Sequence, residues 1–378
     1  MSAFPGTASF LAITGMGMIS SVGVGVVQAC ASLRAELTRP RPLVYFSVLE
    51  EDSQELVPLT AHPIQGFTEG FAPVGRWLRL AQGCMDDLLA QGVVPERTAR
   101  EFWQRTALLW VGPVLDEGRF LEPRQMGVEV FKQAFLQQLE KVLELPLARS
   151  EARAFNLGHA GLAAALRHAQ ERSSRCSFVE RFLILAMDSY VDELSLEWLQ
   201  LHRRLKTPEA PVGLMPGEAG ACVLVELSSR ARSRGASVQA LVNAASLGQE
   251  ANHFFSRAQS NTPNVGRELS RIIEVALSAV LPPDAPFQGD VISDLNGEVW
   301  RASEWGHTVA RLHTRLGTGV RLVTPCASLG DTGAASGAVA LCVAVRSFHR
   351  KYASGPRSLV VSSAEHGATG AIVVGARG

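Results

Sequence analysis

The sequence has little lysine, no net charge and no closely spaced cysteines. The absence of net charge and of closely spaced cysteines each argues against a class of protein. Only four of the 36 basic residues are lysine, and 36 acidic residues balance them. A chain with zero formal charge gives no electrostatic reason to expect a nucleic acid or an anionic membrane as a partner. The six cysteines contain no Cys-x-x-Cys pair, which excludes the usual zinc-ligand spacing and a small disulfide framework.

The histidines and glycines also fail to form two common kinds of site. His307 and His313 are six residues apart and do not share a helix face, and no His-x-x-x-His spacing occurs in the chain. Gly15 and Gly17 are followed by Gly23, which does not match the dinucleotide-binding pattern Gly-x-Gly-x-x-Gly. We therefore expect no bound metal ion and no cofactor.

An uncharged segment near the N-terminus has to be tested as a membrane span. Residues 10–32 carry no formal charge and are long enough to cross a bilayer. The segment contains four glycines, however, and the first arginine, Arg34, follows it, whereas a signal peptide begins with a basic region. A buried strand, a glycine turn and a helix explain the segment better, so we expect no membrane span. Scattered cysteines in apolar stretches are typical of a reducing compartment, which predicts a cytoplasmic protein.

Strands and helices are predicted to alternate along the chain. Apolar runs and alternating patterns predict strands at residues 10–15, 108–114, 181–187, 219–227, 238–247, 290–294, 321–324, 358–363 and 371–375. Apolar residues at steps of three or four, and runs of small residues, predict helices at residues 22–34, 75–91, 128–143, 158–170, 265–280, 303–316 and 332–348. This alternation predicts an α/β protein with mainly parallel sheets and helices on their faces. Residues 38–72 contain several prolines and little periodicity, so we expect an irregular insertion there.

The length and the small-residue segments indicate a large layered protein. A chain of 378 residues, 47% of them hydrophobic, suffices for two domains or one duplicated unit. We expect two similar halves, residues 1–235 and 236–378. Small residues dominate residues 158–166 and 330–344, which indicates helices packed closely on several sides. A helix between two sheets needs such residues because bulky side chains would force the layers apart.

Four segments carry a resemblance to one known family. They are residues 12–23 (AITGMGMISSVG), 213–226 (GLMPGEAGACVLVE), 328–337 (SLGDTGAASG) and 362–370 (SSAEHGATG). In this order they resemble the first strand and turn, the glycine–glutamate segment, the glycine–histidine loop and the closing glycine-rich loop of β-ketoacyl synthases. The resemblance covers nearly the whole chain. It implies a thiolase-like five-layer αβαβα fold of two similar halves, usually a homodimer, and a link to fatty acid or polyketide biosynthesis.

The residues that perform condensation in this family are missing from the matching positions. In the family, a cysteine at the start of a buried helix takes the acyl group, because the helix dipole and backbone N–H groups favour the thiolate. The matching position holds Gly158, which cannot form a thioester, and the neighbouring His159 is not an acyl carrier. The family's two histidines match positions near Leu295 and at Gly330 or Asp331, where no histidine occurs, and its lysine is absent as well. The resemblance therefore implies a protein without condensing chemistry.

Several polar residues remain as candidates for a pocket. They are Gly158, His159, Asp294, Asn296, Glu298, Asp331, His366 and Gly367. Backbone N–H groups at residues 158–159 and 366–367 would form an anion-binding corner, or else they belong to ordinary tight turns. Asp294, Asn296 and Glu298 would form a polar pocket wall, or else a solvated turn.

Three further residues are interpreted through the resemblance. His366 stands roughly where the family has a phenylalanine that gates the pocket. Glu218 matches a structural glutamate that ties loops near the pocket, and its charge would need partners if it is buried. Cys326 is interpreted as a core residue instead of a displaced nucleophile, because no histidine pairs with it in the sequence.

Three functions fit these observations. The first is a non-condensing pseudo-ketosynthase that binds an acyl chain, acyl-CoA or an acyl carrier protein, or serves as a dimer partner. It would form a homodimer, or a heterodimer with a ketosynthase-like subunit. The second is an acyltransferase or thioester hydrolase with rebuilt chemistry, in which His366, Asp331 or Glu298 acts as acid or base. The third is an interaction module in a larger assembly, and fold alone does not choose among the three.

Overall fold

A computed structural model describes residues 10–50, 52–175, 178–258 and 262–377. Its strands are β1 (Leu11–Ser20), β2 (Gly23–Val24), β3 (Arg41–Glu50), β4 (Glu55–Ala61), β5 (Thr106–Val111), β6 (Arg153–Phe155), β7 (Arg181–Ser189), β8 (Glu218–Leu227), β9 (Ala240–Gln249), β10 (Gly289–Ser293), β11 (Val320–Val323), β12 (Arg357–Ser363) and β13 (Ala368–Ala376). Its α-helices are α1 (Val26–Arg34), α2 (Pro73–Ala90), α3 (Arg100–Gln104), α4 (Leu121–Met126), α5 (Val128–Leu143), α6 (Gly161–Arg175), α7 (Glu193–Leu201), α8 (Ser228–Ser233), α9 (Arg267–Ser278), α10 (Val299–Arg311), α11 (His313–Leu316), α12 (Cys326–Leu329) and α13 (Ser336–His349). Short 3-10 helices are η1 (Arg149–Glu151), η2 (Gly158–Ala160), η3 (Phe254–Ala258) and η4 (Gly333–Ala335).

The strand order shows that the two halves of the chain are built alike. Within the described residues the main sheet runs β11-β10-β12-β13-β9-β1-β8-β7-β5-β6. Starting from the centre, β1-β8-β7-β5-β6 and β9-β13-β12-β10-β11 follow the same plan of two antiparallel pairings and then two parallel ones. The prediction of two similar halves is therefore confirmed.

The prediction of mainly parallel sheets was wrong, because half of the pairings in each set of five strands are antiparallel. β12 and β13 are joined by a short turn, and a turn of that length can only connect antiparallel strands. A second difference concerns the number of sheets. Residues 11–13 of β1 pair with residues 240–242 of β9, so the two expected sheets are joined edge to edge into one.

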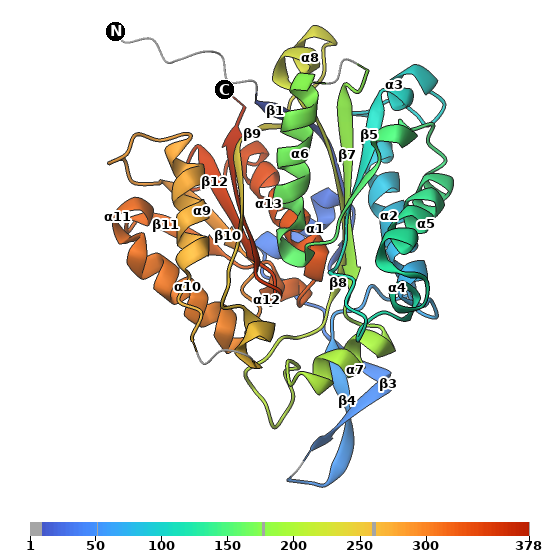
Figure 1. Cartoon of the computed structure of the whole chain (residues 1–378), viewed down its shortest axis with the longest axis vertical. Helices are drawn as coiled ribbons and strands as arrows, with labels where there is room; N and C mark the ends of the chain where they lie inside the picture. The colour runs from blue at the N-terminus through green and yellow to red at the C-terminus, as the bar shows by residue number, and fades with distance from the viewer. Residues whose placement is uncertain (1–9, 51, 176–177, 259–261, 378) are drawn as a thin grey trace.

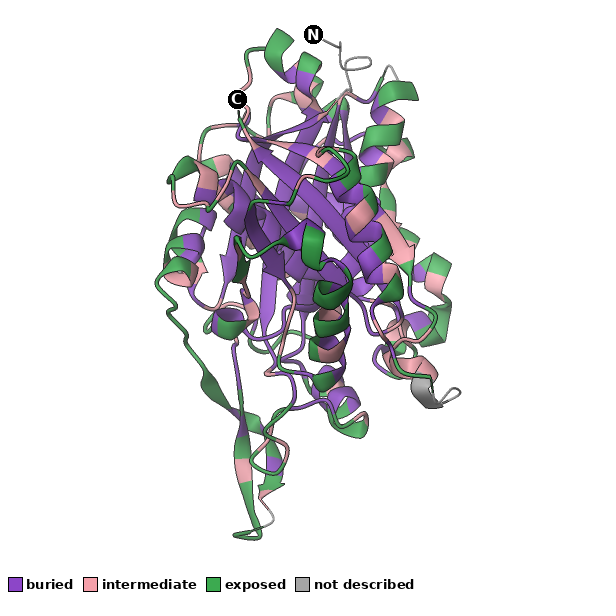
Figure 2. Ribbon diagram, turned by 90° about the vertical axis from the view of Figure 1, so that its left-hand side faces the viewer, coloured by how far each residue is buried: buried purple, intermediate pink, exposed green. Residues whose placement is uncertain are grey.

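The helices and the two halves of the sheet form five layers (Figure 1). Helices α6 and α13 lie in the middle and contact strands of both halves, while α2 and α5 cover one outer face and α9 and α10 cover the other. The small residues of the central helices allow this close packing, as predicted. A Cβ atom on Gly337 of α13 would lie 3.2 Å from the Cβ atom of Leu162 of α6. Figure 2 shows that most strands of the main sheet are buried, while the β3–β4 hairpin and the outer helices carry exposed residues.

The apolar segment near the N-terminus forms β1, β2 and the first part of α1. β1 is buried along its whole length between β8 and β9, and is longer than the predicted strand at 10–15. Among the residues that the structure describes, no helix is both long and apolar enough to cross a membrane.

The prediction that residues 38–72 are irregular was wrong, because they contain a two-stranded hairpin of β3 and β4. The hairpin projects from the body of the molecule (Figure 1). Its inner face, which includes Leu43, Phe46 and Val48, packs in one cluster with residues of α7. Pro42 and Pro58 lie within the strands and interrupt the sequence pattern by which strands are recognised. Proline is tolerated because both strands of an isolated ribbon have a free edge.

Candidate functional site

The segments matched to the family's condensing residues meet at one place in the fold. Gly158 begins η2, which leads into α6, and Asp331 precedes η4, which leads into α13. The loop after β10 carries Asp294, Asn296 and Glu298, and the turn between β12 and β13 carries His366. η2 contacts η4, β12 and β13. The structure therefore brings together segments that lie far apart in the sequence, from Gly158 to His366.

A histidine–aspartate pair lies at the centre of this place. The Nε2 atom of His159 is 2.8 Å from Oδ1 of Asp331, and both side chains are fully buried. The Asp331 carboxylate also accepts hydrogen bonds from the backbone N–H of Gly333 at 2.8 Å and from Nδ2 of Asn296 at 2.6 Å. Burial and Arg301 both act to lower the pKa of His159, but Asp331 outweighs them and raises it above its ordinary value. The pKa of Asp331 is lowered: burial opposes the shift, and His159 and Arg301 overcome it.

Two buried arginines fill the space around this pair. Arg301 lies 2.7 Å from the Asp294 carboxylate, 3.2 Å from the ring nitrogens of His159, and donates to the backbone carbonyl of Ser363. Arg204 binds Glu298 through two hydrogen bonds of 2.7 and 2.9 Å. A buried guanidinium costs several kcal/mol unless it is paired, and here carboxylates pair both. We call this set the buried network, and it consists of His159, Arg204, Asp294, Asn296, Glu298, Arg301, Asp331 and Glu365.

Glu365 is the member of the network with the most arginine and histidine neighbours. Its carboxylate lies 3.7 Å from His159, 3.8 Å from Arg204, 3.9 Å from Arg301 and 4.0 Å from His366. Burial acts to raise the pKa of Glu365, but these four groups lower it to about 2. The carboxylate is therefore charged at neutral pH.

The network decides between the alternatives for the loop after β10. Glu298 is buried, Asp294 and Asn296 are largely covered, and all three are hydrogen-bonded. A solvated turn is therefore wrong for this loop. The three side chains line a polar interior, but arginine side chains occupy that interior.

His366 lies at the edge of the site and is partly exposed. Its Nε2 atom is 3.4 Å from Oδ2 of Asp116, and its ring packs on Phe255 with 4.6 Å between ring centres. The hydrogen bond from His366 lowers the pKa of Asp116, although burial partly opposes the shift. Solvent reaches this pair, because 28% of the His366 side chain and 27% of the Asp116 side chain are exposed.

The backbone is in left-handed conformations at the expected nucleophile position and at the residue after the expected gate residue, His366. Gly158 has φ of 55° and Gly367 has φ of 92°. The N–H of Gly367 donates to the carbonyl of Ala364 at 2.9 Å, within the turn between β12 and β13. The Gly367 N–H is therefore used within a tight turn, which is the second of the two alternatives considered for residues 366–367. The anion-binding role of residues 158–159 stays a prediction.

Glu218 and Cys326, the two further residues interpreted from the sequence, have contrasting surroundings. Glu218 is fully buried and accepts hydrogen bonds from the Ile64 N–H at 2.8 Å and from Ser189 at 2.9 Å, and it lies 3.2 Å from Arg76. These contacts join β8 to the segment that follows the β3–β4 hairpin, and the structural role of Glu218 stays a prediction.

Burial, together with Asp331 and Asp294, raises the pKa of the Cys326 thiol well above its ordinary value. A reactive thiolate is therefore disfavoured there.

The sequence did not single out Arg204, Arg301 or Glu365. Glu298 and Arg301 are three residues apart at the start of α10, a spacing typical of ion pairs on helices, but many surface pairs share it. A buried pair of Arg119 and Asp188, 2.8 Å apart, was missed as well. Asp188 also accepts a hydrogen bond of 3.0 Å from the N–H of Ala334 in η4, next to the network. Across the described residues, no group of histidine, cysteine, aspartate and glutamate is arranged to hold a metal ion.

Comparisons with solved structures identify the fold. No family model and no curated protein matches the sequence. Among solved structures, the ishigamide ketosynthase/chain length factor matches with a TM-score of 0.73 and 17% identity, covering 98% of this chain and 100% of that one. A ketosynthase bound to a hexaketide, in complex with a type II polyketide acyl carrier protein, matches with a TM-score of 0.73, 13% identity and the same coverage. A β-ketoacyl synthase from Burkholderia phymatum STM815 matches with a TM-score of 0.69 and 16% identity, again covering 98% of this chain and 100% of that one. The chain therefore has the thiolase-like fold of the ketosynthases over nearly its whole length.

Proposed function

We propose that this chain is a non-condensing subunit with a ketosynthase fold, and that it acts by associating with a second chain of the same fold. The observation that carries the proposal is the buried network, which fills the place that the family resemblance assigns to the condensing residues. An acyl-enzyme needs a nucleophile, and Gly158 supplies none.

The charge arrangement supports the absence of condensation in a second way. Arg204 and Arg301 are buried in this network, beside the positions matched to the condensing residues, and each is paired with at least one carboxylate. Displacing a paired buried arginine leaves its carboxylate without a partner, at a cost of about 3–5 kcal/mol. A ligand would have to offset that cost before it could reach the centre of the site. A role through association needs no such rearrangement.

The similar structures support association as the mode of action. One of them is named as a ketosynthase/chain length factor, and another as a ketosynthase in complex with its acyl carrier protein. By analogy, we propose a homodimer or a heterodimer with a ketosynthase as the working form of this chain, with an acyl carrier protein as a further partner. The described cysteines are free thiols, which agrees with the cytoplasmic location that we also propose.

Two measurements test the proposal. The first is intact-mass spectrometry after incubation with acyl-CoA and acyl-carrier thioesters, together with an assay for released thiol. We expect no acyl adduct and no thiol release, and an adduct at any residue would contradict the proposal. The second is native mass spectrometry of the chain alone and mixed with a type II ketosynthase. We expect a homodimer or a mixed dimer, whereas a monomer under both conditions would leave association without support.

A second candidate function, thioester hydrolysis, is favoured by the pair of His366 and Asp116. The pair is partly exposed, and an imidazole held by a carboxylate is the usual arrangement of a general base acting on water. If this candidate is correct, thiol release occurs without an adduct. It is then abolished by His366→Gln and reduced by Asp116→Asn. The matched control His202→Gln, which changes a nearby histidine packed on Phe255, should leave the release unchanged.

A further inference from the structure

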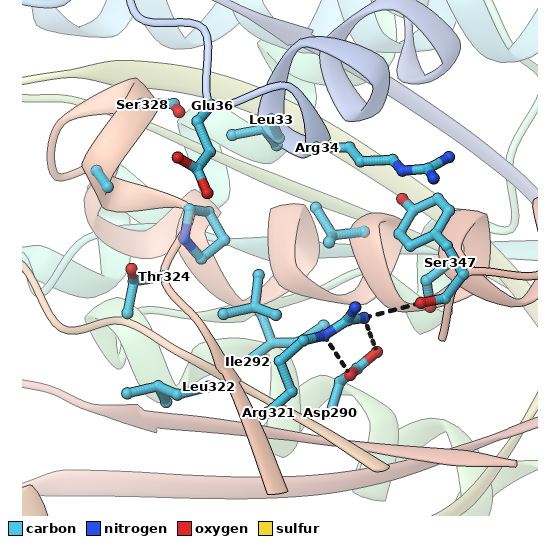
Figure 3. Close-up of a pocket in the computed structure, with 15 residues that line it drawn as sticks. Leu33, Arg34, Glu36, Asp290, Ile292, Arg321, Leu322, Thr324, Ser328 and Ser347 are labelled. Carbon is cyan, nitrogen blue, oxygen red and sulfur yellow. Dashed lines mark hydrogen bonds and ion pairs between the residues drawn. The ribbon is translucent and has the colours of Figure 1, made fainter. Parts of the chain in front are cut away.

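A cavity separate from the buried network lies between the outer strands of the C-terminal half and helices α1 and α13. Its volume is about 480 Å³. Pockets that hold small molecules measure about 300–1,000 Å³, so the size fits a compact ligand. Figure 3 shows the residues that line it, which come from α1, β10, β11, α12 and α13 and from the segments next to them.

The interior of this cavity is mainly apolar. Its apolar lining consists of Leu33, Ile292, Leu322, Val323, Pro325 and Val343. Ile292 and Val343 are buried, and they face the cavity from the sheet and from the central helix α13 respectively. Such a lining favours a ligand with a hydrocarbon or aromatic body, because binding would remove apolar surface of both the ligand and the cavity from contact with water.

Two arginines line the cavity, and their charges are satisfied differently. Arg321 forms two hydrogen bonds of 2.8 Å with Asp290 and a third of 3.0 Å with the carbonyl of Tyr352. Arg34 lies 4.3 Å above the Tyr352 ring, and within the described part of the chain no carboxylate forms an ion pair with it. Arg34 is therefore the cation that remains open to an anionic group of a ligand.

Glu36 places a negative charge on the other side of the cavity. Figure 3 shows its carboxylate pointing toward Thr324, on the side away from the guanidinium of Arg34. Glu36 follows the end of α1 with φ of 54°, and the N–H of Leu37 donates to the carbonyl of Ser32 at 2.9 Å. Glycine is the usual residue at this position of a helix end, because side chains disfavour the left-handed conformation. A glutamate held there against its backbone preference indicates a use for the carboxylate.

We propose that this cavity binds a small amphipathic monocarboxylate. The apolar body of the ligand lies between Ile292 and Val343, and its carboxylate binds Arg34. Glu36 repels a second carboxylate and so excludes diacids. The site is independent of the proposed association function, since it contains no residue of the buried network.

A matched set of three eight-carbon compounds tests the proposal by isothermal titration calorimetry. Octanoate carries one carboxylate, octanamide carries none and suberate carries one at each end. We expect saturable binding of octanoate, about fivefold tighter than that of octanamide, because an exposed ion pair contributes up to about 1 kcal/mol. Suberate should bind more weakly than octanoate. Equal affinities for octanoate and octanamide, or no saturable binding of octanoate, would overturn the proposal.

Three variants assign the binding to this cavity. Arg34→Gln should abolish the preference for octanoate over octanamide while leaving octanamide binding in place. Glu36→Gln should strengthen suberate binding and leave octanoate binding close to that of the unmodified chain. Ala327→Trp should block binding of all three compounds, because Ala327 is exposed and lines the cavity. Octanoate binding that persists in Ala327→Trp, with a folded circular dichroism spectrum, would place the ligand elsewhere and refute the assignment.

Discussion

The imidazole of His159 lies 2.8 Å from the carboxylate of Asp331, and this contact joins the two halves of the chain at their centre. His159 is in η2, at the start of the central helix α6, and Asp331 is just before η4, at the start of the central helix α13. The resemblance matches Gly158, the residue before His159, to the condensing cysteine, and it matches Gly330 or Asp331 to the second histidine. Here His159 and Asp331 form an ionic contact between the starts of two helices, which agrees with the non-condensing subunit that we propose.

The contact predicts how stability depends on pH. The folded-state pKa of His159 is raised above its ordinary value of 6.5, so its protonation stabilises the protein fully below pH 6.5. That contribution is lost as the pH rises through the folded pKa. We expect the free energy of unfolding in urea to fall as the pH rises above 6.5. Asp331→Asn should be less stable and should lose most of this dependence, because the carboxylate that raises the pKa is gone. His307→Gln, at an exposed position, should keep it. An unchanged slope in Asp331→Asn would contradict the assignment.

The pair of Arg204 and Glu298 predicts a difference between single and double substitutions. Glu298→Gln removes the charge that pairs with the Arg204 guanidinium and leaves an acceptor for only one of its two short hydrogen bonds, so we expect a loss of about 3–5 kcal/mol of folding stability. The double variant Arg204→Met with Glu298→Leu removes both charges and should lose less. Chemical denaturation of the single and double variants measures the difference. A double variant that is less stable than Glu298→Gln would show that the network contributes more than paired charges.

Gly158 predicts a small cost for adding a side chain at the expected nucleophile position. A Cβ atom there would lie 3.5 Å from the Cβ atom of Ala364, an ordinary contact, so the cost comes from φ of 55° alone. We expect Gly158→Ala to reduce stability by about 1–2 kcal/mol. In Gly217→Ala, the new Cβ atom would lie 2.1 Å from the carbonyl oxygen of Leu329, so we expect a larger loss. Thermal melts of the two variants should rank in this order, and the reverse order would contradict the geometry.

Glu36 predicts that a substitution can stabilise the protein while changing its ligand preference. Glu36→Gly removes the cost of a left-handed glutamate at the end of α1, so we expect a gain of about 1 kcal/mol in folding stability. The same change removes the negative charge beside the cavity and should increase suberate binding. The matched control Lys351→Gly relieves another left-handed residue, outside the cavity, and should affect stability only. A loss of stability in Glu36→Gly would indicate that the carboxylate holds this segment in place.

The four segments quoted from the sequence identified the fold because their glycines and small residues meet local requirements of tight turns and close helix packing. The small residues of α6 and α13 are needed wherever a helix is packed on several sides, and this need is visible in the sequence without any contact map. The hairpin of β3 and β4 escaped detection for the opposite reason. Pro42 and Pro58 are unusual inside strands and are tolerated only because the ribbon has free edges.

The sequence by itself determined that residue 158 is glycine and that no histidine stands at the positions that the resemblance matches to the family's histidines. Only the tertiary structure decided which groups surround these positions. Arg204 and Glu298 are 94 residues apart, and His159 and Asp331 are 172 residues apart. No local period or motif records such pairings. They arise because folding removes these charges from water together, and each charge is then stabilised by whichever opposite charge lies closest.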